Sequence, residues 1–185
     1  QARIIATFSN AYSVCHILRP IGNKGFFSLG DILVSENLTE NFMGNYIISG
    51  DFIQSKTEPI GKLYGGAVES PVDYDLIWHG VADTSDENKT KNTYSIWKPI
   101  APVGYTCPGY IVNKRKLKPN KNQIMCIKNE FIEVSSKPPP GRRLLHEFIW
   151  DNKNYSVAQK VKGLTLWVPN VLENDRRIDY FVPFD

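Results

Sequence analysis

Histidine and cysteine are the residue types in this chain that most readily support catalysis or metal binding, and it has three of each. His16, His79 and His146 lack the i, i+4 spacing of a helical zinc site, and no Cys-x-x-Cys pair is present. Cys15 directly precedes His16, and neighbouring strand residues point to opposite faces of a sheet, so the two do not form a nucleophile and its base. No Gly-x-Ser-x-Gly motif or phosphate-binding glycine loop occurs. The sequence therefore predicts no metal site, no cofactor and no catalytic residue, and we expect a protein that is not an enzyme.

The cysteines also bear on disulfide bonding. An odd number of cysteines does not make a disulfide framework. Cys107 and Cys126 lie on a predicted corner and on the strand after it, so one bridge between them is geometrically conceivable. Cys15 would then stay free and buried, as lone cysteines usually are.

Three glycosylation sequons fall in predicted loops and begin at Asn37, Asn88 and Asn154. A chain rich in asparagine also forms such triplets by chance. Gln1 as the first residue would suit a chain whose signal peptide has been cleaved, and equally a trimmed chain. We expect a secreted or extracellular protein, with the cytoplasmic face of an endomembrane as the alternative.

The densest run of charge is basic and lies between two predicted strands. Lys114, Arg115, Lys116 and Lys118 stand close together, while the net charge of the whole chain is only +3. One interpretation is a solvated loop. The other is a contact with anionic lipid headgroups, to which each basic residue near the surface contributes ~1 kcal/mol. Because no aromatic residues are interleaved with these charges, nucleic-acid binding is not expected.

The aromatic residues fall into two groups by their expected position. Tyr105, Tyr110, Phe26 and Phe27 lie on corners rich in glycine or proline, where rings can remain exposed. We expect these four to stack on sugars or to insert into a membrane interface. The tryptophans instead recur at matching places of a repeat and are expected to meet in a shared core. They are Trp78, Trp97, Trp150 and Trp167.

An internal repeat in the sequence indicates which strands and corners carry the residues discussed above. Shifting the sequence by 79 positions lays Ile17–Ile32 on Ile96–Ile111 without a gap. The prolines and glycines that coincide are Pro20 with Pro99, Gly25 with Gly104 and Gly30 with Gly109. A shorter echo runs from Phe148-Ile-Trp150 to Leu166-Trp-Val-Pro169. We expect three units, at about residues 3–74, 75–146 and 147–185, of which the last is atypical.

Short strands separated by turns predict an all-β protein. Pro99 and Pro102 are expected to end the ladder of their strand, and Gly104 to take a positive φ at the corner that follows. The predicted strands are Ala2–Phe8, Tyr12–Leu18, Asp31–Val34, Tyr46–Ser49, Phe52–Ile53, Lys62–Val68, Asp75–His79, Gln123–Ile127, Phe131–Val134, His146–Trp150, Leu164–Val168 and Ile178–Val182, with others in the central repeat. We expect one domain over residues 1–185, in which pseudo-symmetric repeats form a β-prism-like or β-sandwich assembly.

The central unit resembles a repeat of the vacuolar-protein-sorting-associated family. In that family a Ser-Ile-Trp-Arg-Pro strand leads into Pro-Pro-Gly-Tyr and then Leu-Gly-Asp-Val. Here Leu76–Val134 contains Tyr-Ser-Ile-Trp-Lys-Pro, Pro-Val-Gly-Tyr and Gly-Tyr-Ile-Val. Ile17–Ile53 matches moderately, through Leu29-Gly-Asp-Ile32, and Phe148–Pro169 matches in part. The central copy departs from the family where Pro108-Gly-Tyr110 replaces Leu-Gly-Asp.

Related repeats occur in the large bridge-like lipid-transfer proteins of vacuolar sorting. The resemblance implies a β-rich, non-catalytic module linked to membranes or adaptor proteins, and it carries over no catalytic residue. We therefore expect a binding module whose partner is an anionic membrane lipid or a protein adaptor. A lectin-like protein that binds glycans, or the receptor-binding part of a toxin, would use the same loops and is the alternative. The oligomeric state is left open.

Overall fold

The computed structural model describes residues 2–21, 27–35, 67–83, 92–132, 145–153, 162–170 and 182–184, and within these ranges the chain is all-β. Its strands form several small antiparallel sheets, with two short 3-10 helices between strands. The strands predicted at Tyr46–Ser49 and Phe52–Ile53, and most of the one at Lys62–Val68, lie outside the described residues.

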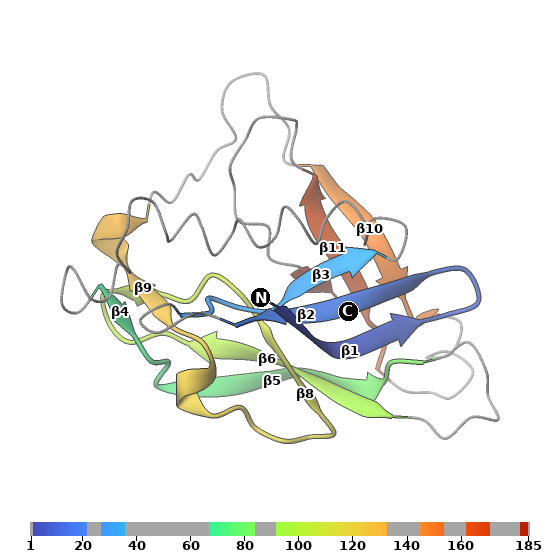
Figure 1. Ribbon diagram of the computed structural model, residues 1–185, viewed down its shortest axis with the longest axis horizontal. Helices are drawn as coiled ribbons and strands as arrows, with labels where there is room; N and C mark the ends of the chain where they lie inside the picture. Colours follow the sequence, from blue (N-terminus) through green and yellow to red (C-terminus); the bar gives the residue numbers. More distant parts are fainter. Residues whose placement is uncertain are drawn as a thin grey trace.

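The described strands form four sheets of three strands each, and three of these sheets each take their strands from one stretch of the chain. The first sheet contains β1 (Ala2–Ser9), β2 (Val14–Pro20) and β3 (Ile32–Ser35). The second contains β5 (Asp73–Val81), β6 (Thr93–Ile100) and β8 (Ile111–Lys114). The third contains β10 (Leu145–Asp151), β11 (Thr165–Asn170) and β12 (Val182–Phe184). In Figure 1 the first sheet (blue) lies above the second (green), and the third (orange) stands to the right, next to the first.

All three sheets have a β-bulge at the same place between their first two strands. The residue left out of the pairing is Ile5, Ile77 or Ile149, an isoleucine in each case. The pairs that resume the ladder are Ala6–Ile17, Trp78–Ile96 and Trp150–Leu166. A bulge bends its strand and increases the local twist, so each sheet is deformed at the same point.

The third strand of each sheet stops short of a proline in the middle strand. The pairs nearest to the proline are Leu18–Ile32, Trp97–Ile111 and Trp167–Val182. The expectation that Pro99 ends the ladder is wrong, because Pro99 lies inside β6 and pairs with Tyr74 on β5. Pro20 and Pro169 lie inside β2 and β11 in the same way. At each proline the middle strand has a neighbour on one side only, where a residue without an N–H is tolerated.

One hydrophobic core lies between the three sheets. The buried positions that the pairing makes equivalent are Ala6, Trp78 and Trp150 on the first strands and Ile17, Ile96 and Leu166 on the middle strands. Phe8 of β1 packs against the other two sheets, since its ring centroid lies 5.0 Å from that of Trp150 and 6.1 Å from that of Trp78. Aromatic pairs at these separations stabilise a core beyond their buried area. The prediction that the tryptophans meet in a shared core is therefore confirmed for Trp78 and Trp150.

The other two tryptophans lie outside that shared core. Trp97 belongs to a separate buried cluster, whose members are Tyr74, Trp97, Ile111 and Ile124. Trp167 is half-buried. Each donates its indole N–H to the hydroxyl two residues before it, Trp97 to Ser95 at 2.8 Å and Trp167 to Thr165 at 3.1 Å. Trp78 and Trp150 thus occupy equivalent positions in the shared core, whereas Trp97 and Trp167 occupy equivalent positions outside it.

A fourth, smaller sheet lies beside the second and forms its corner. It contains β4 (Val68–Glu69), β9 (Cys126–Lys128) and β7 (Tyr105–Thr106). A disulfide joins Cys107, just after β7, to Cys126 at the start of β9, and Cys15 is free and buried in the shared core. The disulfide therefore links the end of β7 to the start of β9, which are paired in this sheet.

Two predicted strands in this region begin in 3-10 helices instead. The strand predicted as Gln123–Ile127 is confirmed only at Cys126 and Ile127, which lie in β9, because Gln123 ends the 3-10 helix η2 (Lys121–Gln123). The one predicted at Phe131–Val134 begins in η3 (Asn129–Phe131), and residues 133–134 lie outside the described residues. The side chain of Gln123 accepts a hydrogen bond from the backbone N–H of Asn120 at 3.0 Å. Side chains that bond to nearby backbone groups compete with a strand ladder, which explains the difference at η2.

Candidate functional site

The basic run forms a loop with a defined conformation, which we call the basic loop (residues 114–118). Lys114 ends β8 opposite Tyr94, and Arg115 takes a left-handed φ of 55°. The backbone N–H of Arg115 donates to the carbonyl of Thr93 at 2.7 Å. The side-chain amide of Asn113 donates to the carbonyl of Leu117 at 3.0 Å. These two hydrogen bonds fix the path of the loop, while all five of its side chains are exposed.

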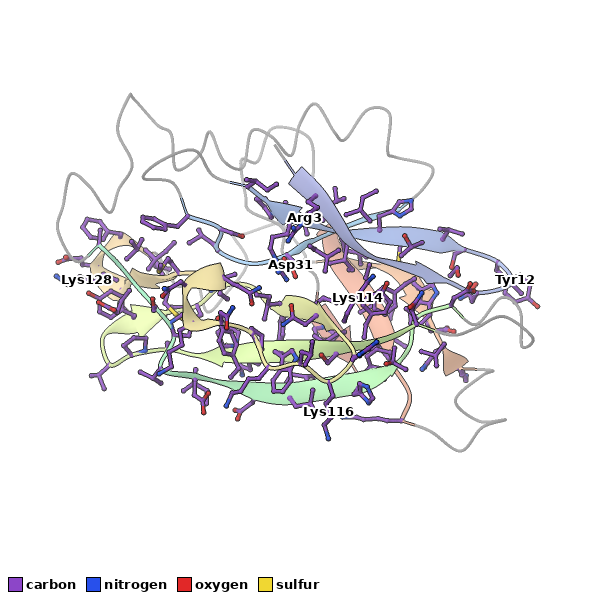
Figure 2. The ribbon with its side chains drawn as sticks, turned by 60° about the horizontal axis from the view of Figure 1, so that its bottom comes forward. Arg3, Tyr12, Asp31, Lys114, Lys116 and Lys128 are labelled. Atoms are coloured by element: carbon purple, nitrogen blue, oxygen red, sulfur yellow. A yellow bond between two sulfur atoms is a disulfide. The ribbon has the colours of Figure 1, made fainter. Side chains whose placement is uncertain are left out.

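Three of the four basic residues are available for a partner and one is not. Lys118 forms an ion pair of 2.5 Å with Asp73, and both side chains are about half exposed. The pKa of Asp73 lies below its ordinary value, mainly because Lys118 donates a hydrogen bond to its carboxylate. No ion pair is formed between the side chains of Lys114, Arg115 or Lys116 and any described residue. Figure 2 shows Lys116 pointing away from the ribbon at the bottom of the view.

An apolar side chain that the sequence analysis did not single out lies within the basic loop. Leu117 has 61% of its surface exposed, although it is large and hydrophobic. Its neighbours Lys116 and Lys118 are both charged and exposed. The sequence does show a leucine between two lysines. This pattern does not distinguish a loop that only faces solvent from a loop that binds a partner. An exposed leucine ringed by cations suits an interface that is both apolar and anionic.

The basic loop and the aromatic corner do not lie together. Lys114 pairs with Tyr94, whereas the corner with Tyr105 follows Ile100 at the other end of β6. Six strand residues separate these ends, or roughly 20 Å. Tyr105 is half-buried and pairs with Lys128 across β7 and β9. The aromatic corner and the basic loop are therefore separate surfaces.

The other aromatic candidates also differ from expectation. Tyr110 is half-buried and packs against the shared core, so it is not an exposed platform. Phe27 is 38% exposed and stands next to a cavity described below. Phe26 lies outside the described residues. Among the described residues the most exposed ring is that of Tyr12, which the sequence analysis did not single out; it is 88% exposed at the tip of the β1–β2 hairpin (Figure 2).

The corner after β6 presents apolar aliphatic side chains instead. Residues 102–105 form a β-turn in which the N–H of Tyr105 donates to the carbonyl of Pro102 at 3.1 Å. Gly104 has a φ of 83°, as the third residue of a type II turn requires, so the predicted positive φ is confirmed. Val103 is fully exposed at the tip, and Ile100 beside it is partly exposed.

A buried ion pair explains the Leu29-Gly-Asp-Ile32 motif as a structural feature. Asp31 accepts two hydrogen bonds from Arg19, at 2.8 and 2.9 Å, and one from the backbone N–H of Val112 at 2.7 Å. Burial raises the pKa of Asp31, while Arg19 and the N–H of Val112 act in the opposite direction. Val112 lies on β8, so the pair joins the first sheet to the second. Lys98 and Tyr110 replace both partners in the central unit, which therefore lacks the pair.

The histidines form no metal centre among the described residues, where no group of three or more histidine, cysteine or acidic side chains comes together. His16 shares a hydrogen bond of 3.0 Å between its Nδ1 and the Oγ1 of Thr7, and His79 is exposed. The sequons at Asn37, Asn88 and Asn154 lie outside the described residues. Within the described part of the chain, no helix is long and apolar enough to span a membrane.

Comparison with known proteins gave one family and one solved structure. The model of the family described as vacuolar protein sorting-associated protein 62 matches residues 8–171. The crystal structure of GNIP1Aa from Chromobacterium piscinae is similar with a TM-score of 0.57 at 15% sequence identity, over 92% of this chain. The match covers 29% of the GNIP1Aa chain, so it concerns part of a longer protein and supports the fold alone. No curated protein matches the sequence.

Proposed function

The chain belongs to the family of vacuolar protein sorting-associated protein 62, and from that membership we propose that it is a non-enzymatic module that binds anionic membrane surfaces through its basic loop. The observation that carries the proposal is the fixed loop on which Leu117 is exposed together with three cations that form no ion pair with a described residue. A protein adaptor with an acidic surface is the alternative partner. The relation to bridge-like lipid-transfer proteins stays a prediction.

We infer that the three sheets are repeats arranged about one axis, as in a β-prism. Support comes from the bulge that all three share and from the buried positions that pair in the same way. Such an arrangement places loops of the three units at the ends of the assembly. It also explains how one scaffold can carry different loops, since the core positions are independent of them.

The expected strength of membrane binding is modest. Lys114, Arg115 and Lys116 together contribute about 3 kcal/mol near an anionic surface. Inserting Leu117 into the interface adds about 2 kcal/mol. A total of about 5 kcal/mol corresponds to a dissociation constant of roughly a few tenths of a millimolar. Binding by this loop alone is therefore reversible, and it weakens with salt because exposed charges are screened.

Cosedimentation with vesicles of phosphatidylserine and phosphatidylcholine tests the proposal. The variant K114Q/R115Q/K116Q removes these three cations and leaves the ion pair of Lys118 intact. A matched control changes three exposed or half-exposed lysines elsewhere, K98Q/K128Q/K153Q. Both variants lower the formal net charge from +3 to 0.

We expect the loop variant to lose binding and the control to keep most of it. Leu117→Ser should weaken binding about tenfold or more without changing its dependence on salt, because it removes only the apolar contribution. Equal losses in the two triple variants would mean that net charge alone drives binding. Undiminished binding by the loop variant would refute a role for the loop.

One observation favours glycans as a second candidate. Tyr12 is 88% exposed at the end of a hairpin that a hydrogen-bonded turn holds in place, since Asn10 Oδ1 accepts from the N–H of Tyr12 and of Ser13, both at 2.8 Å. A rigid exposed ring can stack on a sugar. A glycan array with the parent chain and with Tyr12→Ala tests this: a sugar that only the parent binds would favour a lectin-like function.

A further inference from the structure

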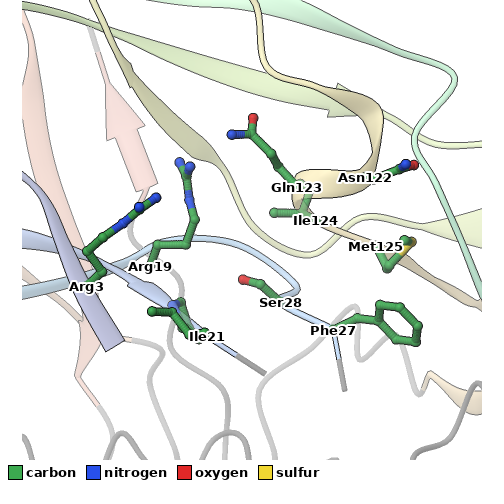
Figure 3. A pocket seen from close by; sticks show the side chains of 10 residues that line it. Arg3, Arg19, Ile21, Phe27, Ser28, Asn122, Gln123, Ile124 and Met125 are labelled. Atoms are coloured by element: carbon green, nitrogen blue, oxygen red, sulfur yellow. The ribbon is translucent and has the colours of Figure 1, made fainter. Parts of the chain in front are cut away.

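A cavity lies between the first sheet and the segment around η2, and none of its described lining residues belongs to the basic loop. Its volume is about 230 Å³, and its lining includes Arg3 of β1, Arg19 of β2, and Gln123 and Met125 on the opposite side. Figure 3 shows the guanidinium groups of Arg3 and Arg19 side by side, pointing in the direction of Gln123. Two segments that are far apart in the sequence thus meet around one space.

The polar groups that face this cavity are mainly donors, because other contacts already use their acceptors. The Oε1 atom of Gln123 accepts from the N–H of Asn120 at 3.0 Å, which leaves its amide N–H groups. The Oδ1 atom of Asn122 accepts from the hydroxyl of Ser70 at 3.2 Å, which likewise leaves an amide N–H₂. Arginine offers five N–H donors and no acceptor. An occupant must therefore supply acceptors.

The charge of the lining has one sign. Among the described residues that line the cavity, none is acidic. The carboxylate of Asp31, which lies nearby, is fully occupied by Arg19 and by the N–H of Val112. Arg19 is therefore neutralised, whereas Arg3 is exposed and forms no ion pair with a described residue. The cavity thus has an excess positive charge that belongs to Arg3.

The remaining wall is apolar. Ile21 and Phe27 are 49% and 38% exposed at the rim, and Ile124 beneath them is buried. Met125 adds a flexible thioether beside the ring of Phe27 (Figure 3), a combination that packs well against flat apolar groups. Specific sites for small molecules usually combine such an apolar wall with a few placed polar groups.

We propose that this cavity binds a small soluble organic anion, in which a carboxylate or phosphate is attached to a compact apolar or aromatic group. The oxygens accept hydrogen bonds from Arg3 and from the amide of Gln123, and the apolar group packs against Phe27 and Met125. The volume is below the range of typical drug-sized sites, so the occupant is small. This site is independent of the basic loop and does not rest on membrane binding.

Nuclear magnetic resonance titration of the full chain tests the proposal with four probes: phenyl phosphate, benzoate, inorganic phosphate and benzyl alcohol. The aromatic anions carry both features, and each of the other two carries one. Gln123→Glu places a carboxylate in the cavity and keeps an oxygen that can accept the hydrogen bond from the N–H of Asn120. Arg3→Gln removes the unpaired charge, and Lys98→Gln is the control for a loss of one charge elsewhere.

We expect an aromatic anion to shift the amide resonances of Phe27 and Met125, with roughly tenfold weaker binding by Arg3→Gln and Gln123→Glu and unchanged binding by Lys98→Gln. Equal affinity for inorganic phosphate would overturn the apolar half of the proposal. Equal affinity of Arg3→Gln and the parent would overturn the anionic half. If Arg3→Gln instead abolished vesicle binding, the cavity would take a lipid headgroup, and the assignment to a soluble anion would be wrong.

Discussion

Replacing Asp31 by alanine should remove a large part of the stability of this protein. The carboxylate is fully buried, and it accepts two hydrogen bonds from Arg19 and one from the N–H of Val112. The variant leaves a guanidinium in the interior with only the carbonyl of Val112, at 2.7 Å, and it leaves a backbone N–H unpaired. Removing one partner of a buried pair costs about 3–5 kcal/mol. Because a domain is stable by only about 5–15 kcal/mol, unfolding of Asp31→Ala should begin at much lower urea concentrations.

Urea unfolding followed by tryptophan fluorescence measures this cost, with the unchanged slope against urea as a check on two-state behaviour. The double variant Arg19→Met/Asp31→Leu is the companion measurement. Replacing both charges by apolar groups should recover most of the loss, although the N–H of Val112 still costs about 1–3 kcal/mol. A loss below about 1 kcal/mol in Asp31→Ala would refute the reasoning. So would a double variant that is less stable than Asp31→Ala.

Three further predictions concern single positions. Gly104→Ala should lower the free energy of unfolding by about 1 kcal/mol through backbone strain alone, because its φ is 83° and no atom lies within 4 Å of the added Cβ; a loss of several kcal/mol in urea unfolding would contradict this. Gly80→Ala should be more harmful, because its Cβ would collide with the indole ring of Trp78 in the shared core, and near-ultraviolet circular dichroism should report the displaced ring. Burial raises the pKa of Cys15 to about 12 from an ordinary 9.0, so its contribution to stability is present below pH 9 and is lost as the pH rises towards 12. The unfolding free energy should fall by about 1.4 kcal/mol more in the parent than in Cys15→Ala between pH 8 and 10, and equal slopes would show that the thiol is accessible when folded.

The sequence was sufficient for the class of fold and for the positions of most strands in the described ranges. Alternation of apolar and polar residues is a local property, and it located β1, β2, β5 and β10 to within a few residues. The repeat in the sequence was also informative, because the shift of 79 that relates Leu18 to Trp97 relates their strand partners Ile32 and Ile111 as well. Turn chemistry at Gly104 was readable for the same reason, since a type II turn is determined by four neighbouring residues.

The tertiary structure alone decided how these pieces meet. Pro99 stays inside its strand because β8 ends before it, and the partner of a strand is not a local property. Tyr110 packs against the core, although its turn-rich surroundings resemble those of an exposed corner. The basic run is nearly continuous in sequence, but Lys118 is paired with Asp73, whereas its basic neighbours form no ion pair with a described residue.

The buried pair of Arg19 and Asp31 shows the physical reason for this limit. Nothing in the chain near either residue indicates that both also bond to Val112, which lies 93 residues from Arg19 and 81 from Asp31. The same holds for the cavity, where Arg3 meets Gln123 only because η2 folds back over the first sheet. Local interactions set the conformation of a segment, whereas burial and charge pairing depend on which distant segments exclude water from it.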